Sequence, residues 1–261
     1  MRQSKVLAKL RSGGFARICG LGHFLPFFIR HAAHFKYDGI WLDLEHRAMT
    51  DREVQALLAY CHLSDIDCMV RPATTERSRL YRYLEDGAAG FMCPFVSNAD
   101  TARQLVQSVK FPPEGNRGID GAGLDGDYVI EAWRPGGSYF ADANKQTFIV
   151  AQIETLEAVE NVEAIAEVRG IDCLFIGPAD LGRRLSVASN SNGLTLEKAI
   201  ERVAQAARQE NIAWGITAGS LEHLERYRKM GAQMIPWGGD FHLMRVLENC
   251  SKELDSALEP Q

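Results

Sequence analysis

Short apolar segments rich in β-branched and aromatic residues alternate with longer amphipathic segments along the whole chain. This alternation is typical of parallel strands joined by helices. The apolar segments predict eight strands, at Ala16–Gly22, Gly39–His46, Cys68–Pro72, Gly90–Val96, Phe148–Thr155, Cys173–Ile176, Ile212–Thr217 and Met234–Gly238. Because the spacing is even and no G-x-G-x-x-G motif follows the first strand, the pattern favours an α/β fold of the closed (β/α)8 TIM-barrel type over an open doubly wound sheet.

The amphipathic segments predict the helices between these strands. They lie at Pro26–Phe35, Asp51–His62, Glu76–Asp86, Asn98–Lys110, Leu156–Val168, Leu196–Glu210 and Ser220–Met230, and a last helix runs from Phe241 onward. Four residues, Thr50, Ser97, Thr195 and Gly219, stand where a helix N-cap is expected. Thr50 with Glu53 also fits a capping box, in which each residue bonds the backbone N–H of the other.

One long stretch, Phe111–Gln146, departs from the regular alternation. It is rich in Gly, Pro and Asp, which favour turns over helices and strands. In a compact domain, a stretch of this length usually forms a functional loop or a subunit contact.

Length and composition match a single barrel domain over residues 1–261, with 46% hydrophobic residues, 24% charged residues and a formal net charge of -5. Because a mildly acidic chain lacks the basic field that attracts phosphate backbones, we expect no nucleic-acid partner. The polar N-terminus lacks the apolar core of a signal peptide and no later run reaches membrane-spanning length, so we expect a cytoplasmic protein without membrane contact. Six cysteines without a C-x-x-C pair are predicted to be buried free thiols.

Reactive side chains collect where the predicted strands end, which is the edge of a barrel that carries the chemistry. The polar groups at these ends are Asp43, Glu45 and His46 after the second strand, Arg71 after the third, Gln152 and Glu154 after the fifth, Asp180 after the sixth and Asp240 after the eighth. Their convergence predicts an active site at the carboxyl ends of the strands.

Gln152 and Glu154 share one face of the fifth strand, because side chains alternate along a strand. Burying them among the helices would be costly, so we expect both to point into the barrel mouth. Glu154 and Asp180 would then supply two oxygen ligands to a hard divalent ion such as Mg2+ or Mn2+. The alternative is that Glu154 caps the next helix and that Asp180 is a turn residue.

Arg71 ends a buried strand, where an arginine needs an anion as its partner. A substrate carboxylate would fit its bidentate guanidinium, and a structural ion pair with Glu45 is the alternative. His46 follows Asp43 and Glu45, which can orient an imidazole for proton transfer, although a structural histidine also fits. All eight lysines fall in predicted helices or loops, so a Schiff-base mechanism is not expected.

Six motifs give the chain a resemblance to the HpcH/HpaI family of class II pyruvate aldolases. They are D-x-E-H at Asp43–His46, V-R-P at Val70–Pro72, P-x-V-x-N-A at Pro94–Ala99, P-P-x-G-x-R-G at Pro112–Gly118, Q-I-E-T at Gln152–Thr155 and F-I-G-P-A-D-L at Phe175–Leu181. The last two together are specific. The resemblance covers nearly the whole chain, and it implies a barrel of the phosphoenolpyruvate/pyruvate type and an aldehyde-lyase that cleaves a 4-hydroxy-2-oxo acid.

The same resemblance implies roles for individual residues. Glu154 and Asp180 would hold a divalent metal ion, which is Mg2+ or Mn2+, with Co2+ also possible. Arg71 would bind pyruvate and its enolate, and His46 would be the acid/base group. Other substrate-binding groups would be Gln152 and the backbone of Gly177, Pro178 and Ala179. The resemblance further implies a homo-oligomer, a hexamer, whose last helix, about residues 241–254, packs on a neighbouring subunit.

The chain departs from the family where the aldehyde is expected to bind. Ile18 or Cys19 stands where a tryptophan is usual, Thr217 replaces an aliphatic residue, and the loop after Gly118 differs. The aldehyde half therefore stays open at this point. A citramalyl- or malyl-CoA lyase, a phosphate-binding barrel isomerase and a non-catalytic scaffold are the rival interpretations, although no basic cluster suited to a CoA diphosphate is present.

Overall fold

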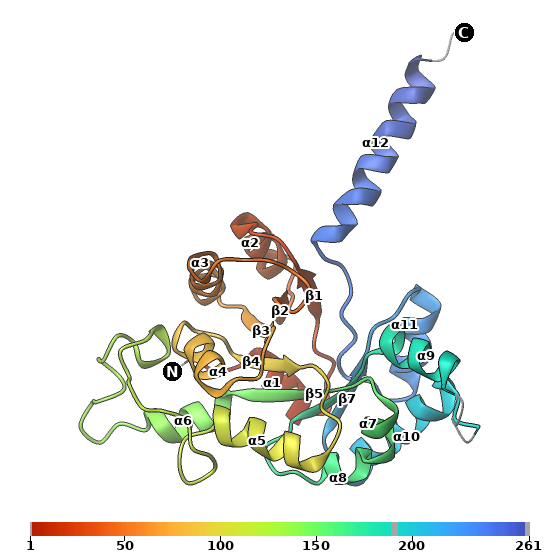
Figure 1. Cartoon of the computed structure of the whole chain (residues 1–261). Helices are drawn as coiled ribbons and strands as arrows, with labels where there is room; N and C mark the ends of the chain where they lie inside the picture. Colours follow the sequence, from red (N-terminus) through yellow and green to blue (C-terminus); the bar gives the residue numbers. More distant parts are fainter. Residues whose placement is uncertain (1, 189–192, 259–261) are drawn as a thin grey trace.

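The computed structural model describes residues 2–188 and 193–258. Within them, a curled parallel sheet of seven strands follows the chain order (Figure 1). The strands are β1 (Ile18–Leu21), β2 (Gly39–Asp43), β3 (Asp67–Arg71), β4 (Gly90–Cys93), β5 (Phe148–Ile153), β6 (Cys173–Ile176) and β7 (Ala213–Ile216). Because neighbouring strands are parallel, all their carboxyl ends reach the same edge. The predicted α/β class and its parallel sheet are confirmed.

The eighth strand, expected at Met234–Gly238, is not formed as a regular strand. The first residue of this segment makes isolated parallel bridges with Ala16 and with Gly215. Pro236 offers no N–H to a ladder, and Gly238 has a φ of 89°, outside the range of a strand. The segment therefore lies between β7 and β1, and its residues hydrogen-bond to both strands without extending the sheet.

Most of the predicted helices are present. They are α2 (Pro26–His34), α3 (Asp51–Leu63), α4 (Arg77–Glu85), α5 (Ala99–Val109), α10 (Leu196–Gln209) and α11 (Leu221–Lys229). The helix expected over Leu156–Val168 is divided into α7 (Leu156–Glu160) and α8 (Val162–Ala166), which meet at Asn161. Three helices were not predicted: α1 (Lys5–Arg11), α6 (Tyr139–Gln146) and α9 (Pro178–Val187).

Two of the four expected N-caps are correct and two are displaced by one residue. Thr50 forms the predicted capping box, and Thr195 caps α10. Ser97 and Gly219 are not caps, because Asn98 and Ser220 accept the hydrogen bonds from the first turns of α5 and α11. In both helices the N-cap is the residue whose side-chain oxygen accepts a hydrogen bond from a free backbone N–H. Glycine has no side-chain oxygen to do this.

The core has two layers that meet at the sheet. One set of strand side chains faces the hollow of the curled sheet and packs there, among them Met69, Met92, Phe148 and Phe175. The other set packs against the covering helices in a larger cluster. Because both faces are buried, the strands are apolar over most of their length, and the buried Asp67 at the start of β3 is an exception.

The stretch Phe111–Gln146 is not wholly irregular. It contains the short 3-10 helix η1 (Leu124–Gly126), and it ends in α6, which packs on Phe111. Its interior ion pair joins Arg117 to Asp125, and both side chains are almost fully shielded from solvent. The prediction of a long loop is therefore correct only for the part before α6.

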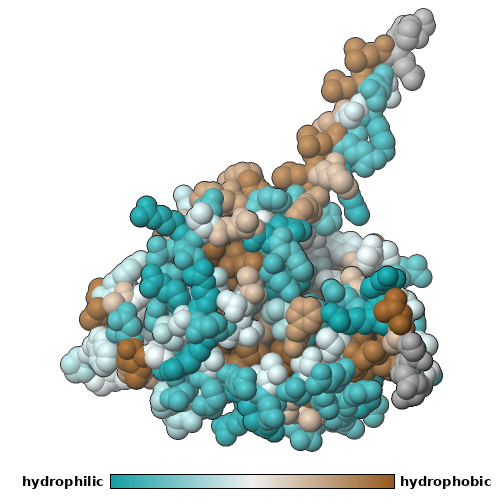
Figure 2. All heavy atoms as spheres, in the orientation of Figure 1, coloured by the Kyte–Doolittle hydropathy of each residue, from teal (hydrophilic) through white to brown (hydrophobic). Residues whose placement is uncertain are grey.

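The last helix in the described residues is α12 (Leu243–Leu258), which follows a 3-10 turn, η2 (Asp240–His242), and extends away from the body (Figure 1). None of its residues is buried, and Figure 2 shows hydrophobic side chains along it. Cys250 lies on this helix and is exposed, so the prediction of buried thiols holds for the other five cysteines and is wrong here.

No helix in the described ranges is long and apolar enough to cross a membrane.

Candidate active site

Arg71, the last residue of β3, lies between two carboxylates from the end of β2. Its Nε donates to Asp43 Oδ1 at 3.0 Å, its Nη2 lies 2.8 Å from Asp43 Oδ2, and its Nη1 lies 3.2 Å from Glu45 Oε2. The guanidinium carbon lies 4.9 Å from the ring centre of Trp41. The ion pair with Glu45, which the sequence left as an alternative, is therefore present. Two of the five guanidinium N–H groups remain for a ligand.

Asp43 is held in its ionised form by its neighbours. Asp43 has a pKa below its ordinary value, because hydrogen bonds from Arg71 and from two backbone N–H groups outweigh the effect of burial. The backbone donors belong to Glu45 and His46, at 3.1 and 3.3 Å. Asp43 thus fixes both Arg71 and the loop that carries His46.

Glu154 follows β5 and is almost fully buried, with 2% of its surface exposed. Its Oε1 accepts the backbone N–H of Phe95 at 2.9 Å, and its Oε2 accepts from Gln152 Nε2 at 2.5 Å. Burial raises the pKa of Glu154 to about 7, and the negative charges of Glu45 and Asp180 act in the same direction. The Phe95 N–H and the nearby Arg71 oppose this rise.

Four residues that the sequence placed at the strand ends lie near enough to one another to interact electrostatically. Arg71, Glu45, Asp180 and Glu154 come from four different strand ends or the loops after them, and the first three all act on the carboxyl of the fourth. Asp180 lies in the first turn of α9 and is exposed. The alternative that Glu154 caps the following helix is wrong, because Thr155 caps α7.

Gly177, the residue before α9, lets the chain pass close to these side chains. A Cβ at this position would lie 2.6 Å from Glu154 Oε2 and 3.1 Å from Gln152 Nε2. Only glycine allows this approach, since a side chain here would displace the carboxylate or the amide. Pro178 and Ala179 follow as the first residues of α9.

The oxygen atoms of this site suit a divalent cation whose remaining ligands come from the substrate and from water. Within residues 2–188 and 193–258, no three His, Cys, Asp or Glu side chains are arranged to hold a metal ion. Glu154 is nevertheless a buried carboxylate whose hydrogen-bond partners, among the residues that the structure describes, are the neutral Phe95 N–H and Gln152 amide, and Gln152 Oε1 is buried without a partner among them. A bound cation would compensate the charge, and carboxylate oxygens are the ligands that hard divalent ions prefer.

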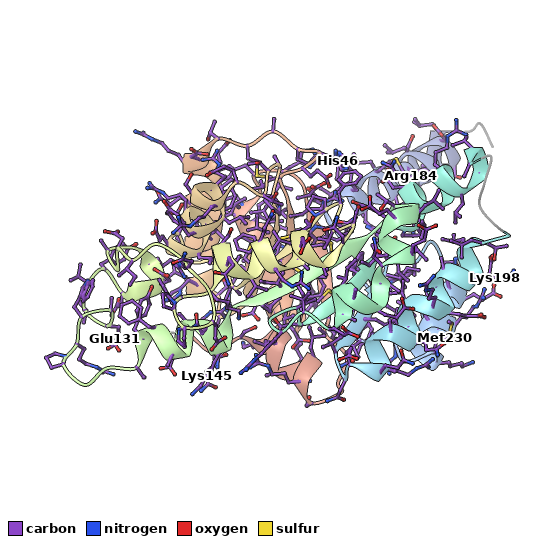
Figure 3. All side chains as sticks on the ribbon, turned by 60° about the horizontal axis from the view of Figure 1, so that its bottom comes forward. His46, Glu131, Lys145, Arg184, Lys198 and Met230 are labelled. Carbon is purple, nitrogen blue, oxygen red and sulfur yellow. The ribbon has the colours of Figure 1, made fainter. Side chains whose placement is uncertain are left out.

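His46 lies at the rim of the site. Its side chain is 56% exposed, and its Nε2 is 3.5 Å from Glu45 Oε2. In Figure 3, His46 and Arg184 lie along one edge of the molecule, and Lys145 and Met230 lie toward the opposite edge. His46 is therefore accessible to a molecule that binds beside Arg71.

Phe95 is a site residue that the sequence did not indicate. It has a φ of 54°, which a phenylalanine rarely adopts, and this backbone conformation turns its N–H toward Glu154. The guanidinium carbon of Arg184 lies 5.5 Å from the ring centre of Phe95. Since the contribution comes from a backbone N–H, no residue type could have revealed it.

A cavity of about 600 Å³ lies elsewhere, between α3 and α4. Its charged lining residues include Asp51 and Arg79, which pair with each other through two hydrogen bonds of 2.9 and 2.7 Å. Because these charges neutralise one another at an exposed surface, the chemistry of the strand ends is the stronger indication of an active site.

Comparisons with known proteins identify the family of the chain. A family model described as HpcH/HpaI aldolase/citrate lyase matches residues 21–246. The chain is 32% identical over 209 residues to 5-keto-4-deoxy-D-glucarate aldolase of Klebsiella pneumoniae, covering 80% of each chain. It is 31% identical over 210 residues to 4-hydroxy-2-oxo-heptane-1,7-dioate aldolase of Escherichia coli, covering 80% of this chain and 78% of that one.

A solved structure shares the fold over nearly the full length. The crystal structure of an HpcH/HpaI aldolase/citrate lyase family protein from Burkholderia cenocepacia is similar at a TM-score of 0.87 and 28% identity. The match covers 97% of this chain and 100% of the other. The described strand ends therefore lie in a fold that is already known among these proteins.

Proposed function

Because the chain belongs to the HpcH/HpaI aldolase/citrate lyase family, we propose that it cleaves a 4-hydroxy-2-oxo acid reversibly to pyruvate and an aldehyde. The observation that carries this proposal is the buried carboxyl of Glu154, which contacts Gln152 and lies against Gly177, with the charges of Arg71, Glu45 and Asp180 near enough to act on it. One cationic group and several anionic groups then surround a place where an enolate oxygen and a cation can meet.

Glu154 and Asp180 would hold the divalent cation, Mg2+ or Mn2+, with Gln152 beside it. When bound, such an ion polarises the C2 oxygen of the substrate as a Lewis acid. The two carboxylates leave coordination positions for substrate and water, which suits an ion that keeps several labile ligands. Co2+ also fits oxygen ligands of this kind.

Arg71 binds the pyruvate half in this proposal. When the C3–C4 bond of the substrate breaks, the electron pair moves toward C2 and negative charge develops on the C2 oxygen. The two free N–H groups of Arg71 can donate to that oxygen, while Asp43 and Glu45 hold the guanidinium in place. The backbone of Gly177, Pro178 and Ala179 would bind the C1 carboxylate at the start of α9.

In this proposal, His46 accepts the proton of the C4 hydroxyl as the C3–C4 bond breaks. The enolate then takes up a proton at C3 to become pyruvate, and both proton transfers run backward in aldol addition. The exposed ring of His46 is close to Glu45, which also contacts Arg71. A base positioned in this way typically contributes roughly 10²–10⁴ in rate. Glu45 thereby couples the enolate-binding group to the proton acceptor.

The names of the two relatives favour an aldolase over a citramalyl- or malyl-CoA lyase and over a phosphate-binding isomerase. The test is release of pyruvate from 4-hydroxy-2-oxoheptanedioate by the purified protein with Mn2+, followed through reduction of pyruvate by lactate dehydrogenase. We expect metal-dependent release that stops with EDTA. Cleavage of malyl-CoA but not of the hydroxy-oxo acid would contradict the proposal.

Gly177→Ala should abolish most of this activity while the protein stays folded. The added methyl carbon would lie 2.6 Å from Glu154 Oε2, which is too close for two unbonded atoms, and would displace the carboxylate. We expect kcat/KM for pyruvate release to fall by about 10²-fold, since a shift of about 1 Å in a reacting group has this effect. Gly182→Ala, on the same helix with no close contact, is the control that keeps activity.

We further propose that the chain is a single barrel domain, closed by the segment between β7 and β1, and that it forms a homo-oligomer, a hexamer by family resemblance. The exposed helix α12 carries an apolar stripe formed by Leu243, Leu247, Cys250, Leu254 and Leu258. A helix with an apolar face and no buried residue is stable when that face packs on another surface. A second copy of the chain is the proposed surface.

Leu247→Asp should therefore break the oligomer. A charge within the buried stripe is costly, so we expect the mass measured by light scattering to fall from that of a hexamer toward that of one chain. Cys250 should at the same time react faster with Ellman's reagent. Asn249→Asp, on the opposite face of α12, should change neither result, and an unchanged mass for Leu247→Asp would refute the role of this face.

A further inference from the structure

Trp41 lies inside the curled sheet, one layer below the polar side chains at the strand ends. It stands in the middle of β2, and Asp43, two positions later, lies on the same face because side chains alternate along a strand. Its indole packs on the side chains that fill the hollow of the sheet, and its ring centre is 5.9 Å from that of Phe175. Trp41 therefore forms part of the floor of the candidate active site.

The neighbouring strand β1 leaves room for this large ring. Gly20 lies opposite Trp41 in the register of β1 and β2, so this position of β1 adds no side chain to the layer that holds the indole. Among the described residues, a Cβ at Gly20 would meet one atom within 4 Å, the carbonyl oxygen of Gly238 at 3.9 Å. The interior beside the indole is therefore wide enough for an aromatic ring under the strand ends.

The indole meets the guanidinium of Arg71 on one face. The guanidinium carbon lies 4.9 Å from the ring centre of Trp41, which is within the range of a cation–π interaction. Asp43 bonds one edge of the guanidinium through Nε and Nη2, and Glu45 contacts Nη1. Because carboxylates bond a guanidinium along its edges, the aromatic ring supplies a contact that neither of them makes.

This contact bears on the two N–H groups of Arg71 that remain for a ligand. Both lie in the plane of the guanidinium, so their direction changes when that plane turns about the edge bonded to Asp43. A ring stacked on one face opposes this turn. The ring also keeps water from that face, and 11% of the Arg71 side chain is exposed. A less hydrated cation attracts a developing negative charge more strongly.

We infer that Trp41 is a positioning residue for enolate formation, and that its aromatic face holds the plane of the Arg71 guanidinium. This inference rests on the proposed function, in which Arg71 donates to the C2 oxygen. The indole N–H is not needed for the role, because Nε1 is buried without a partner among the described residues. A phenylalanine at this position should therefore keep most of the effect, and an aliphatic side chain should lose it.

The test compares Trp41→Leu with Trp41→Phe in the full-length protein, by exchange of the methyl protons of pyruvate in D2O with Mn2+. Both variants shrink the side chain, but only phenylalanine keeps an aromatic face. We expect Trp41→Leu to lower kcat by about tenfold and to change KM by less than about twofold, since the enolate charge develops only during the reaction. Trp41→Phe should keep kcat within about threefold of the wild-type value. Trp214→Phe, which shrinks a buried tryptophan of β7 among the covering helices, is the control that should lower Tm and keep kcat.

A double-mutant cycle separates this role from a purely structural one. In the Arg71→Lys protein, Trp41→Leu should lower kcat by less than about threefold, because lysine has no planar group for the ring to hold. Equal losses with Arg71 and with lysine, or equal kcat for Trp41→Leu and Trp41→Phe, would overturn the inference. Exchange by the wild-type protein is measured in parallel: its presence with an unchanged kcat in Trp41→Leu overturns the inference alone, and its absence overturns the proposed function and the inference together.

Discussion

Arg71→Lys should lower the rate of metal-dependent methyl-proton exchange of pyruvate by roughly 10²–10³-fold, the effect of losing one preorganised donor to a developing oxyanion. Lysine keeps the charge but cannot bond Asp43 through two nitrogens and still reach Glu45 and the substrate. The loss should appear in kcat as well as in kcat/KM, because the enolate forms only during the reaction. Exchange followed by proton NMR in D2O gives both values.

The matched control is Arg202→Lys. Arg202 also makes a two-nitrogen ion pair, with Glu163, but on α10 and away from the strand ends. This variant should retain the exchange rate of the wild-type protein. The contrary result is that Arg71→Lys and Arg202→Lys exchange the methyl protons of pyruvate at the same rate and have the same Tm. That result would show that Arg71 has only a structural role, as the ion-pair partner of Glu45.

Glu154→Gln should lower Mn2+ affinity by at least about tenfold and remove exchange, because the amide is a neutral and poorer ligand. Mn2+ binding can be measured by electron paramagnetic resonance. The neighbouring Glu157→Gln changes an exposed carboxylate and should bind Mn2+ as the wild-type protein does. Tight stoichiometric binding by Glu154→Gln would refute the ligand assignment.

The same variant should be more stable than the wild-type protein when metal is removed by EDTA. The pKa of Glu154 is raised to about 7 in the folded protein, above the value near 4.5 of an exposed glutamate. The ionised carboxylate therefore lowers the stability of the fold fully above pH 7, and this penalty disappears as the pH falls toward 4.5. We expect a higher Tm for Glu154→Gln at pH 8 and nearly equal values at about pH 5.

Much of the fold could be predicted from the sequence, because buried parallel strands and amphipathic helices leave distinct patterns. The eighth strand could not, since its apolar residues match a strand while Pro236 and Gly238 prevent a regular ladder. Helix α9 was missed because its exposed face carries Gly182 and two arginines, and only Leu181 is buried. The family resemblance and the class of carbon–carbon lyase are confirmed by the family match.

The candidate site was predictable where it depends on residue type and alternation. Gln152, in β5, and Glu154, directly after it, do contact each other as the alternation predicts. The sequence offered Glu45 as an ion-pair partner of Arg71 but did not indicate Asp43. Asp43 lies opposite Arg71 because of the register between β2 and β3, which the sequence does not specify. Phe95 acts through its backbone N–H, which no residue type indicates.

The central claim, an enolate of pyruvate formed at Arg71 and Glu154, is tested most directly by exchange of the pyruvate methyl protons in D2O. This measurement requires no knowledge of the aldehyde. With Mg2+ or Mn2+ present, we predict that the purified protein replaces the methyl protons by deuterium and that EDTA stops the exchange. A well-folded, metal-loaded protein that leaves the methyl signal of pyruvate unchanged would contradict this account.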